Sequence, residues 1–201
     1  MQLASIREFR NGLSGYTRTG QFVLVLNHGK MVGCFLPLRR SHHVPVELKN
    51  PREISSGYAH ACALTDDGVK CWGYQAAGKM KAPVGLRNPR SIVGGGEHAC
   101  ALTDDGVKCW GDSFFWQTIV PVLKNPREIT AGAYHSCALT DDGVQCWGLD
   151  EYGPIPAGLK NPRGLTSGGG GSEHTCALTD DGVRCWGWNR YGQTNVPDIE
   201  W

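Results

Sequence analysis

Nine cysteines are the residues of this 201-residue chain whose type and spacing most directly suggest chemistry. Eight of them fall in four similar strings, in which Thr-Asp-Asp-Gly stands between two cysteines. This turn favours a tight β-hairpin that pairs Leu64 with Val69 and sets Cys62 opposite Cys71. Directly opposed residues of antiparallel strands are close enough for a disulfide. The predicted pairs are Cys62–Cys71, Cys100–Cys109, Cys137–Cys146 and Cys176–Cys185.

Paired cysteines in every intact string favour an oxidising compartment, and we expect an extracellular or cell-surface protein. Four reduced, buried pairs in a cytoplasmic protein are the alternative, and the first residues lack the long apolar stretch of a secretory signal. Zinc is less favoured, because each pair is spaced more widely than Cys-x₂₋₄-Cys. Cys34 matches the second member of a pair whose other position holds Val25 or a neighbour, so we expect it to be unpaired.

A histidine stands two residues before the first cysteine of each intact string, at His60, His98, His135 and His174. A ring of these side chains could bind a metal, but we expect each to be hydrogen-bonded to neighbouring backbone. The Asp-Asp-Gly turns lack the further oxygen ligands of a calcium loop. No nucleophile, base and orienting group recur together. We therefore predict no metal, no cofactor and no catalytic residue.

These strings belong to repeats whose equivalent cysteines are 38, 37 and 39 residues apart. A second shared string, Lys/Arg-Asn-Pro-Arg, precedes each of them, for example at residues 49–52. Four intact repeats fill residues 46–201, and residues 1–45 form a degenerate copy, in which residues 7–12 correspond to residues 52–57. Each copy of about 40 residues predicts a small antiparallel sheet, as in a propeller blade. We expect one all-β domain over residues 1–201, a β-propeller of about five short blades; a linear β-solenoid is less favoured.

The string Gly-x-x-His-x-Cys-Ala-Leu…Gly-Val-x-Cys-Trp-Gly resembles the RCC1-like repeat of the regulator of chromosome condensation family. The shortness of each copy is closest to the bacterial branch that includes a β-lactamase inhibitory propeller. Members of the family usually have seven blades. An open arc, or a fragment of a larger propeller, is therefore the alternative to a small closed ring. We expect Trp72, Trp110, Trp147 and Trp186 to pack between blades.

Two sets of loops vary between copies, and strand direction places both on one face of the repeats. One set follows the first strand of each copy, and the other follows Trp-Gly. Near-identical segments occupy the opposite face, which suggests a scaffold with one tuned binding surface. Three consecutive aromatics, Phe114, Phe115 and Trp116, are its sharpest element, although they could instead fold back over a blade edge. The predicted partner-binding residues are these three with Tyr58, Tyr74, Tyr134, Tyr152, Trp188 and Tyr191.

Composition limits the partner. The net charge of +1 gives no reason to expect nucleic-acid binding, and the longest apolar run, residues 22–26, is far too short for a membrane span. We predict a monomeric, non-enzymatic scaffold for an unidentified protein partner, and the resemblance adds enzyme inhibition as one form of this role. A carbohydrate-binding lectin is the alternative. It predicts the same aromatic and polar set in every copy, and the loops share only one aromatic position.

Overall fold

The computed structural model describes residues 48–74, 80–149, 153–168 and 173–197 in full, and residues 2–5, 23–27 and 30–35 by their backbone. Tyr152 and the segment 7–12 lie outside the described residues. Regular structure in the described part of the chain consists of strands, so the protein is all-β as the sequence predicts. Among these residues there is no helix long and apolar enough to cross a membrane.

Each intact copy of the sequence folds into one antiparallel sheet of three consecutive strands, and we number these sheets repeats 1 to 4. Repeat 1 holds β4 (Glu53–Ser56), β5 (His60–Thr65) and β6 (Gly68–Gly73); repeat 2 holds β7 (Ser91–Gly94), β8 (His98–Thr103) and β9 (Gly106–Gly111). Repeat 3 holds β10 (Glu128–Ala131), β11 (His135–Thr140) and β12 (Gly143–Gly148); repeat 4 holds β13 (Arg163–Ser167), β14 (His174–Thr179) and β15 (Gly182–Gly187).

The hairpin between the second and third strands has the same local chemistry in all four repeats. In repeat 1 the Thr65 hydroxyl donates to the carbonyl of Gly68 (2.8 Å) and accepts from the amide of Asp67 (3.2 Å). Gly68 has a φ of 95°, which favours glycine. The predicted register is confirmed, because Leu64 lies opposite Val69 and Cys62 opposite Cys71.

A second set of local hydrogen bonds joins the Lys/Arg-Asn-Pro-Arg segment to the same hairpin. Asn50 has a φ of 43°, a left-handed conformation that asparagine tolerates better than most residues. Its side-chain amide donates to the Asp66 carboxylate over 2.6 Å, and the Asp66 amide donates to the carbonyl of Lys49 over 3.1 Å. Equivalent asparagines in the other repeats bond the equivalent aspartates. The two near-identical segments therefore lie together at one end of every sheet.

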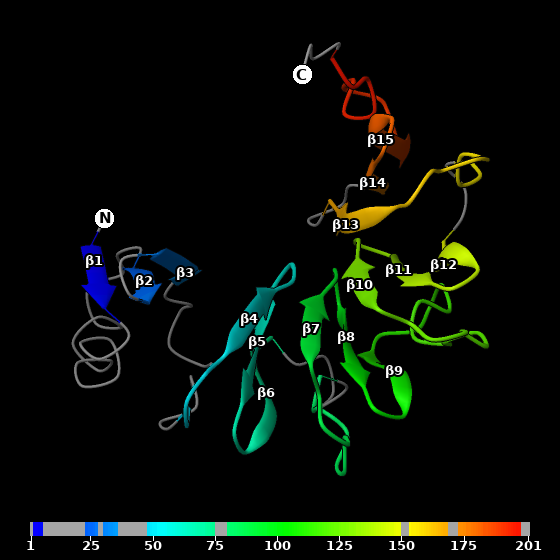
Figure 1. Ribbon diagram of the computed structural model, residues 1–201. Helices are drawn as coiled ribbons and strands as arrows, with labels where there is room; N and C mark the ends of the chain where they lie inside the picture. The colour runs from blue at the N-terminus through cyan, green and yellow to red at the C-terminus, as the bar shows by residue number, and fades with distance from the viewer. Residues whose placement is uncertain are drawn as a thin grey trace.

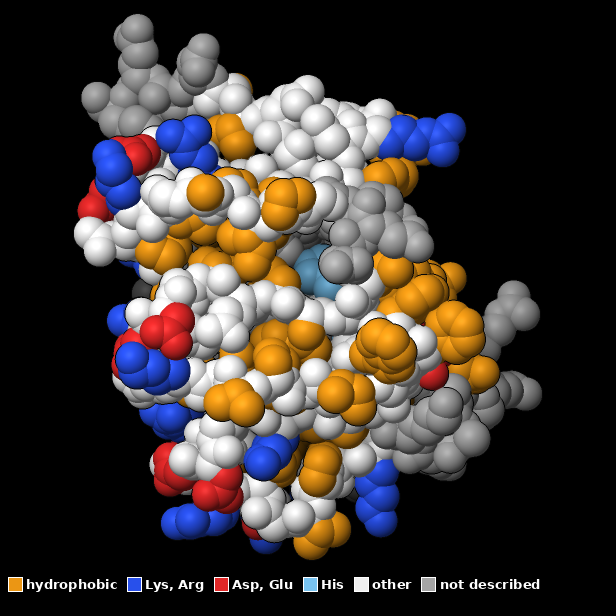
Figure 2. Space-filling model, turned by 90° about the vertical axis from the view of Figure 1, so that its right-hand side faces the viewer, with side chains coloured by type: hydrophobic (Ala, Val, Ile, Leu, Met, Phe, Trp, Pro, Cys, Tyr) orange, Lys and Arg blue, Asp and Glu red, His pale blue; other side chains and the backbone are white. Residues whose placement is uncertain are grey.

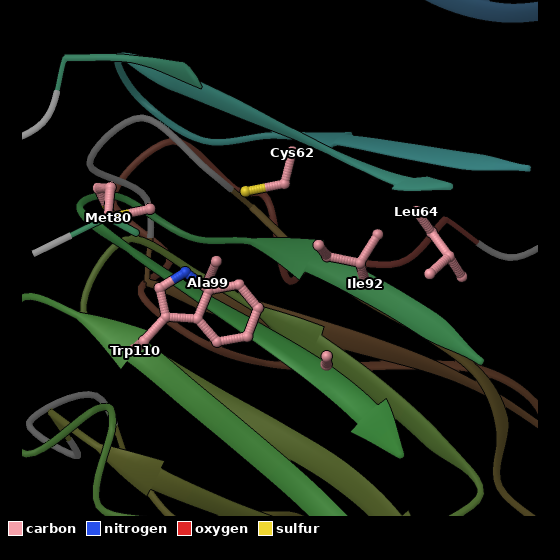
Figure 3. Close-up of a cluster of buried hydrophobic side chains, with 7 residues drawn as sticks. Cys62, Leu64, Met80, Ile92, Ala99 and Trp110 are labelled. Atoms are coloured by element: carbon pink, nitrogen blue, oxygen red, sulfur yellow. The ribbon is translucent and has the colours of Figure 1, made fainter. Parts of the chain in front are cut away.

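The hydrophobic core lies between successive sheets, as Figure 3 shows for repeats 1 and 2. Leu64 from one sheet lies beside Ile92 of the next, and Trp110 lies at the other end of the same cluster, near Ala99 and Met80. Trp110 and Trp186 are buried, and the other two predicted core tryptophans are half-buried. The Glu53 carboxylate also accepts hydrogen bonds from the hydroxyl of Ser91 (3.0 Å) and the amide of Ile92 (3.2 Å). Apolar contact and repeat-to-repeat hydrogen bonds together hold neighbouring blades in register.

The sheets follow one another in chain order as propeller blades, and the arc that they describe in Figure 1 is open. Beyond repeat 1, β1 (Gln2–Ser5), β2 (Val23–Asn27) and β3 (Lys30–Phe35) form a fifth sheet. Here β1 pairs with β2 in parallel, whereas the first two strands of every repeat are antiparallel. The N-terminal copy therefore departs from the blade pattern more than its sequence suggested. Cys34 lies opposite Leu24, the neighbour of Val25.

Candidate binding face

The two variable loops of each repeat meet at the end of the sheet opposite the hairpins that are near-identical from repeat to repeat. Backbone hydrogen bonds join them in every repeat: Tyr74 to Ala59 (2.7 Å), Asp112 to Glu97 (2.7 Å), Leu149 to Tyr134 (2.9 Å) and Trp188 to Glu173 (2.7 Å). We call this surface the variable face. Figure 2 shows hydrophobic side chains spread over one side of the molecule, with many acidic and basic side chains along its edge.

The three consecutive aromatics of repeat 2 differ in how far their side chains are exposed. Phe114 and Trp116 are 79% and 75% exposed. Phe115 is half-buried between them, and its ring packs against Tyr134 of repeat 3 with the centroids 5.0 Å apart. The alternative to partner binding, that these residues fold back over a blade edge, therefore describes Phe115, while its two neighbours project outward.

Local hydrogen bonds fix this loop. The amide of Phe114 donates to the Asp112 carboxylate (3.1 Å), and the amide of Phe115 donates to the side-chain oxygen of Gln117 (2.9 Å). Trp116 has a φ of 63°, an unusual conformation for a bulky side chain. At the same place in repeat 4 the residue is Gly192, with a φ of 79°. A residue in this conformation is often retained for function rather than for stability.

The other predicted partner-binding residues are distributed along the variable face. Tyr58, Tyr74, Tyr134 and Tyr191 are exposed, and Trp188 is half-buried. The structure brings two groups together, one of Phe114, Phe115 and Tyr134 and the other of Trp188 and Tyr191, whose rings are 5.4 Å apart.

The repeated histidines connect successive repeats. His98 Nε2 lies 2.8 Å from the hydroxyl of Ser136 in repeat 3, and His135 Nε2 lies 2.8 Å from the hydroxyl of Thr175 in repeat 4. His135 Nδ1 also lies 2.6 Å from the Glu173 carboxylate. The predicted bonding to backbone is therefore wrong for His98 and His135, which bond to side chains of the next repeat.

His60 interacts with backbone groups of Gly96 and His98, which also belong to the next repeat. Its Nε2 is buried and has no partner, because Ala99 stands where Ser136 and Thr175 stand in the later repeats. Burial lowers the pKa of His60 and of His98 to about 4, so both rings are neutral at physiological pH.

Sequence reasoning missed these inter-repeat partners, although a signal for them exists. A glycine stands three residues before His98, and a Cβ on Gly95 would come within 2.2 Å of the His98 ring. The Gly-x-x-His spacing therefore marks a ring that lies against its own turn. The residue after each histidine is alanine, serine or threonine. It determines whether the histidine of the preceding repeat has a hydroxyl partner.

No group of three metal-ligating side chains occurs in the part of the chain that the structure describes. The carboxylates of the hairpin turns have other partners, since Asp66 accepts from Asn50 and Lys49 pairs with Asp67 over 3.3 Å. The exposed aromatics of the variable face offer apolar contact area, with backbone and side-chain polar groups around it. Such a surface is suited to binding.

The chain matches the family model of the Regulator of chromosome condensation (RCC1) repeat at residues 52–78, 90–115, 127–153 and 166–193, more than half of its length. No curated protein matches it. The CRINKLY WD40 ectodomain of the Arabidopsis thaliana receptor kinase ACR4 is 26% identical over 69% of this chain and 50% of that one, with a TM-score of 0.56. The ectodomain of the Physcomitrella patens receptor kinase CR4 is 28% identical over 69% and 41%, with a TM-score of 0.57.

Prp20p from Saccharomyces cerevisiae is 19% identical over 86% of this chain and 51% of that one, with a TM-score of 0.58, which is a likeness of fold. The chain thus spans about half, or less, of the length of each of these structures. Each of the four matched segments covers most of one three-stranded sheet. The chain belongs to the RCC1 repeat family.

Proposed function

We propose that this protein is a non-enzymatic scaffold that binds a protein partner through its variable face. The observation that carries the proposal is the outward projection of Phe114 and Trp116 from a loop that local hydrogen bonds fix and that Phe115 packs against Tyr134. Large exposed aromatics on a fixed loop are the usual anchors of protein interfaces, because they bury much area and lose little conformational entropy.

The family likeness supports a protein partner. The yeast relative has been described bound to Kap60, and its binding to Gsp1p and histones has been studied. Those partners are not transferred to this chain, because a shared fold does not carry a binding site with it. Four disulfides, each within one hairpin, support an extracellular or cell-surface setting, since such bonds persist in oxidising compartments. Inhibition of an enzyme is one form that the proposed binding could take.

The arrangement favours a protein over a glycan as the partner. A lectin made of repeats would hold each sugar against the same set of groups in every copy. The exposed pair Phe114 and Trp116 occurs in repeat 2 alone of the described repeats, and Tyr191 of repeat 4 has different neighbours, Trp188 and Arg190.

Affinity capture from native extract tests the proposal. The wild-type protein is compared with Phe114→Ala/Trp116→Ala, in which Phe115 is kept because it packs on Tyr134. The matched control is Val84→Ala/Val122→Ala, which removes two almost fully exposed side chains outside the variable loops. We expect a protein that binds the wild type and the control, is lost in the aromatic variant and is indifferent to free monosaccharides.

Capture that free sugars abolish would favour the lectin. Equal capture by all three proteins would refute the assignment of the aromatic loop as the binding site.

A further inference from the structure

A cavity of about 160 Å³ lies between repeats 3 and 4 on the variable face. Its apolar walls include Trp147, Leu149, Ile155 and Trp186, and the buried pair His135 and Glu173 forms part of its polar wall. For comparison, an apolar cavity of about 150 Å³ holds a benzene molecule. Figure 2 shows a histidine side chain among hydrophobic side chains on the side of the molecule that carries β12.

The corresponding places between the earlier repeats are filled by the chain itself. Each lies against the glycine of a Trp-Gly pair. A Cβ placed on Gly111 would meet the sulfur of Met80 at 2.9 Å, and one on Gly148 would meet the Cβ of Gln117 at 3.1 Å. At Gly187, which lines the cavity, the nearest atoms belong to backbone of the same repeat.

The loops beside these places also differ in length. Nine residues separate Trp-Gly from the next proline at the corresponding place in repeats 1, 2 and 4, at 74–82, 112–120 and 188–196. In repeat 3 the corresponding segment, 149–155, has seven residues. Counted from the Trp-Gly pair, Pro154 is the residue of repeat 3 that corresponds to Gln117, and it lines the cavity; proline has neither the reach nor the amide of glutamine.

Gln117 shows which chemistry this kind of place accepts. Its side chain is wholly buried, and its backbone carbonyl accepts hydrogen bonds from the Ser136 hydroxyl (3.1 Å) and the Trp147 indole nitrogen (3.0 Å). Thr175 and Trp186 stand at the matching positions around the cavity. In the described part of the chain, nothing accepts a hydrogen bond from the Trp186 indole nitrogen.

The polar wall of the cavity favours an uncharged occupant. The Glu173 carboxylate already accepts from the amide of Tyr134 (3.1 Å) and contacts His135 (2.6 Å). His135 in turn contacts the Thr175 hydroxyl. A charged ligand group would lose its water without gaining a free counter-charge, which is costly in a buried site.

We propose that this cavity binds a glutamine-bearing segment of the protein partner, with a carbonyl oxygen of that segment bonded to the Trp186 indole nitrogen. The partner would supply from outside what Gln117 supplies from within between repeats 2 and 3. This inference rests on the proposed function, because it adds a second point of contact on the same variable face.

The probe is a fluorescein-labelled peptide with the sequence of residues 189–196, Asn-Arg-Tyr-Gly-Gln-Thr-Asn-Val. It contains Gln193, whose side-chain oxygen accepts from the amide of Tyr191 over 2.9 Å, the same local bond that Gln117 makes with Phe115. Fluorescence anisotropy measures its affinity for the disulfide-bonded protein. The indole N–H signal of Trp186, assigned with Trp186→Phe, reports contact by NMR.

We expect saturable binding that shifts the Trp186 signal. A peptide with glutamate in place of Gln193 should bind at least about tenfold more weakly, as should the wild-type peptide to Trp186→Phe. Replacing residues 149–155 by the sequence of 112–120 gives the protein its own glutamine at this place and should abolish peptide binding. The circular dichroism and melting temperature of each variant verify that it is folded.

The variant Phe114→Ala/Trp116→Ala separates this inference from the proposed function. It should bind the peptide as the wild type does, even where it no longer captures the whole partner. Absence of saturable binding to the wild type, or equal binding to the loop-replaced variant, would overturn the cavity as a glutamine site and leave the aromatic site standing.

Discussion

Ala99→Ser should stabilise the protein, because it supplies a hydroxyl to a buried nitrogen that has none. His60 Nε2 is buried without a partner, whereas His98 and His135 each meet a hydroxyl of the next repeat at 2.8 Å. Ala99 occupies the same strand position as Ser136, a fully buried serine, so the backbone geometry accommodates the added oxygen.

The magnitude follows from one hydrogen bond. A buried hydrogen bond contributes a net 0.5–1.5 kcal/mol or so, and an unsatisfied buried polar atom costs roughly 1–3 kcal/mol. We therefore expect Ala99→Ser to raise the free energy of unfolding by about 1 kcal/mol, which raises the melting temperature by roughly 2–4 °C in a protein of this size. Ser136→Ala should have the opposite sign, since it leaves His98 Nε2 without its partner.

Urea unfolding and calorimetry at pH 7.5, where both rings are neutral, measure the effect. A double-mutant cycle with His60→Phe isolates the contact, because Ala99→Ser should give no gain when the ring nitrogen is absent. A neutral or destabilising Ala99→Ser, found together with a destabilising Ser136→Ala, would refute the contact assigned to the added hydroxyl. A gain in stability that persists in the His60→Phe background would refute it as well.

Three further predictions concern acid, the disulfides and the strained loop. The pKa values of His60 and His98 are about 4 in the folded protein and 6.5 in the unfolded chain, so the unfolded state binds more protons between these two values. The contribution of the two rings to stability is therefore full above about pH 6.5 and falls as the pH drops toward 4. Urea midpoints across this pH range will measure the loss. Cys100→Ser/Cys109→Ser opens one hairpin bridge and should lower the free energy of unfolding by about 2–3 kcal/mol, measured by chemical denaturation. Trp116→Gly removes a bulky residue at a φ of 63° and should leave the melting temperature unchanged or raised while partner capture is lost; a clear loss of stability would contradict the strain at this position.

The sequence was sufficient for the features that depend on a few neighbouring residues. The turn Thr65 to Gly68 determines the hairpin register, and the register places Cys62 opposite Cys71. The disposition of the loops at two ends of each sheet follows from strand direction alone. These predictions succeeded because each one depends on contacts within a single repeat.

Features that arise between repeats were beyond the sequence. The partners of His135 come from the next repeat, at Glu173 and Thr175, some 40 positions away in the chain. The cavity beside Trp186 lies next to a loop that is two residues shorter than its equivalents, but the sequence alone does not show that Gln117 fills the matching place between repeats 2 and 3. The different exposure of Phe114 and Phe115 likewise depends on where Tyr134 lies.

The parallel pairing of β1 and β2 could not be anticipated either. The degenerate N-terminal copy suggested an antiparallel blade with its first strand within segment 7–12, but the strand that pairs with β2 is Gln2–Ser5, and it runs in the other direction. A parallel pair needs a long connection, and the stretch between these strands is long enough for one. The place of a segment within the repeat does not determine the direction of its strand in a copy that lacks the Thr-Asp-Asp-Gly turn.

The four described disulfides each close a hairpin within one repeat, and this gives the protein an uneven response to mechanical tension. Under a pull on the two ends of the chain, contacts between blades can separate, because apolar packing and hydrogen bonds such as those of Glu53 hold them. The disulfide-bonded hairpins stay closed. The residues between the two cysteines of each hairpin, which would span about 30 Å if extended, therefore do not add to the length of the stretched chain. Under tension the described repeats would thus separate in steps at the contacts between blades, while each of the four disulfide-bonded hairpins kept its shape.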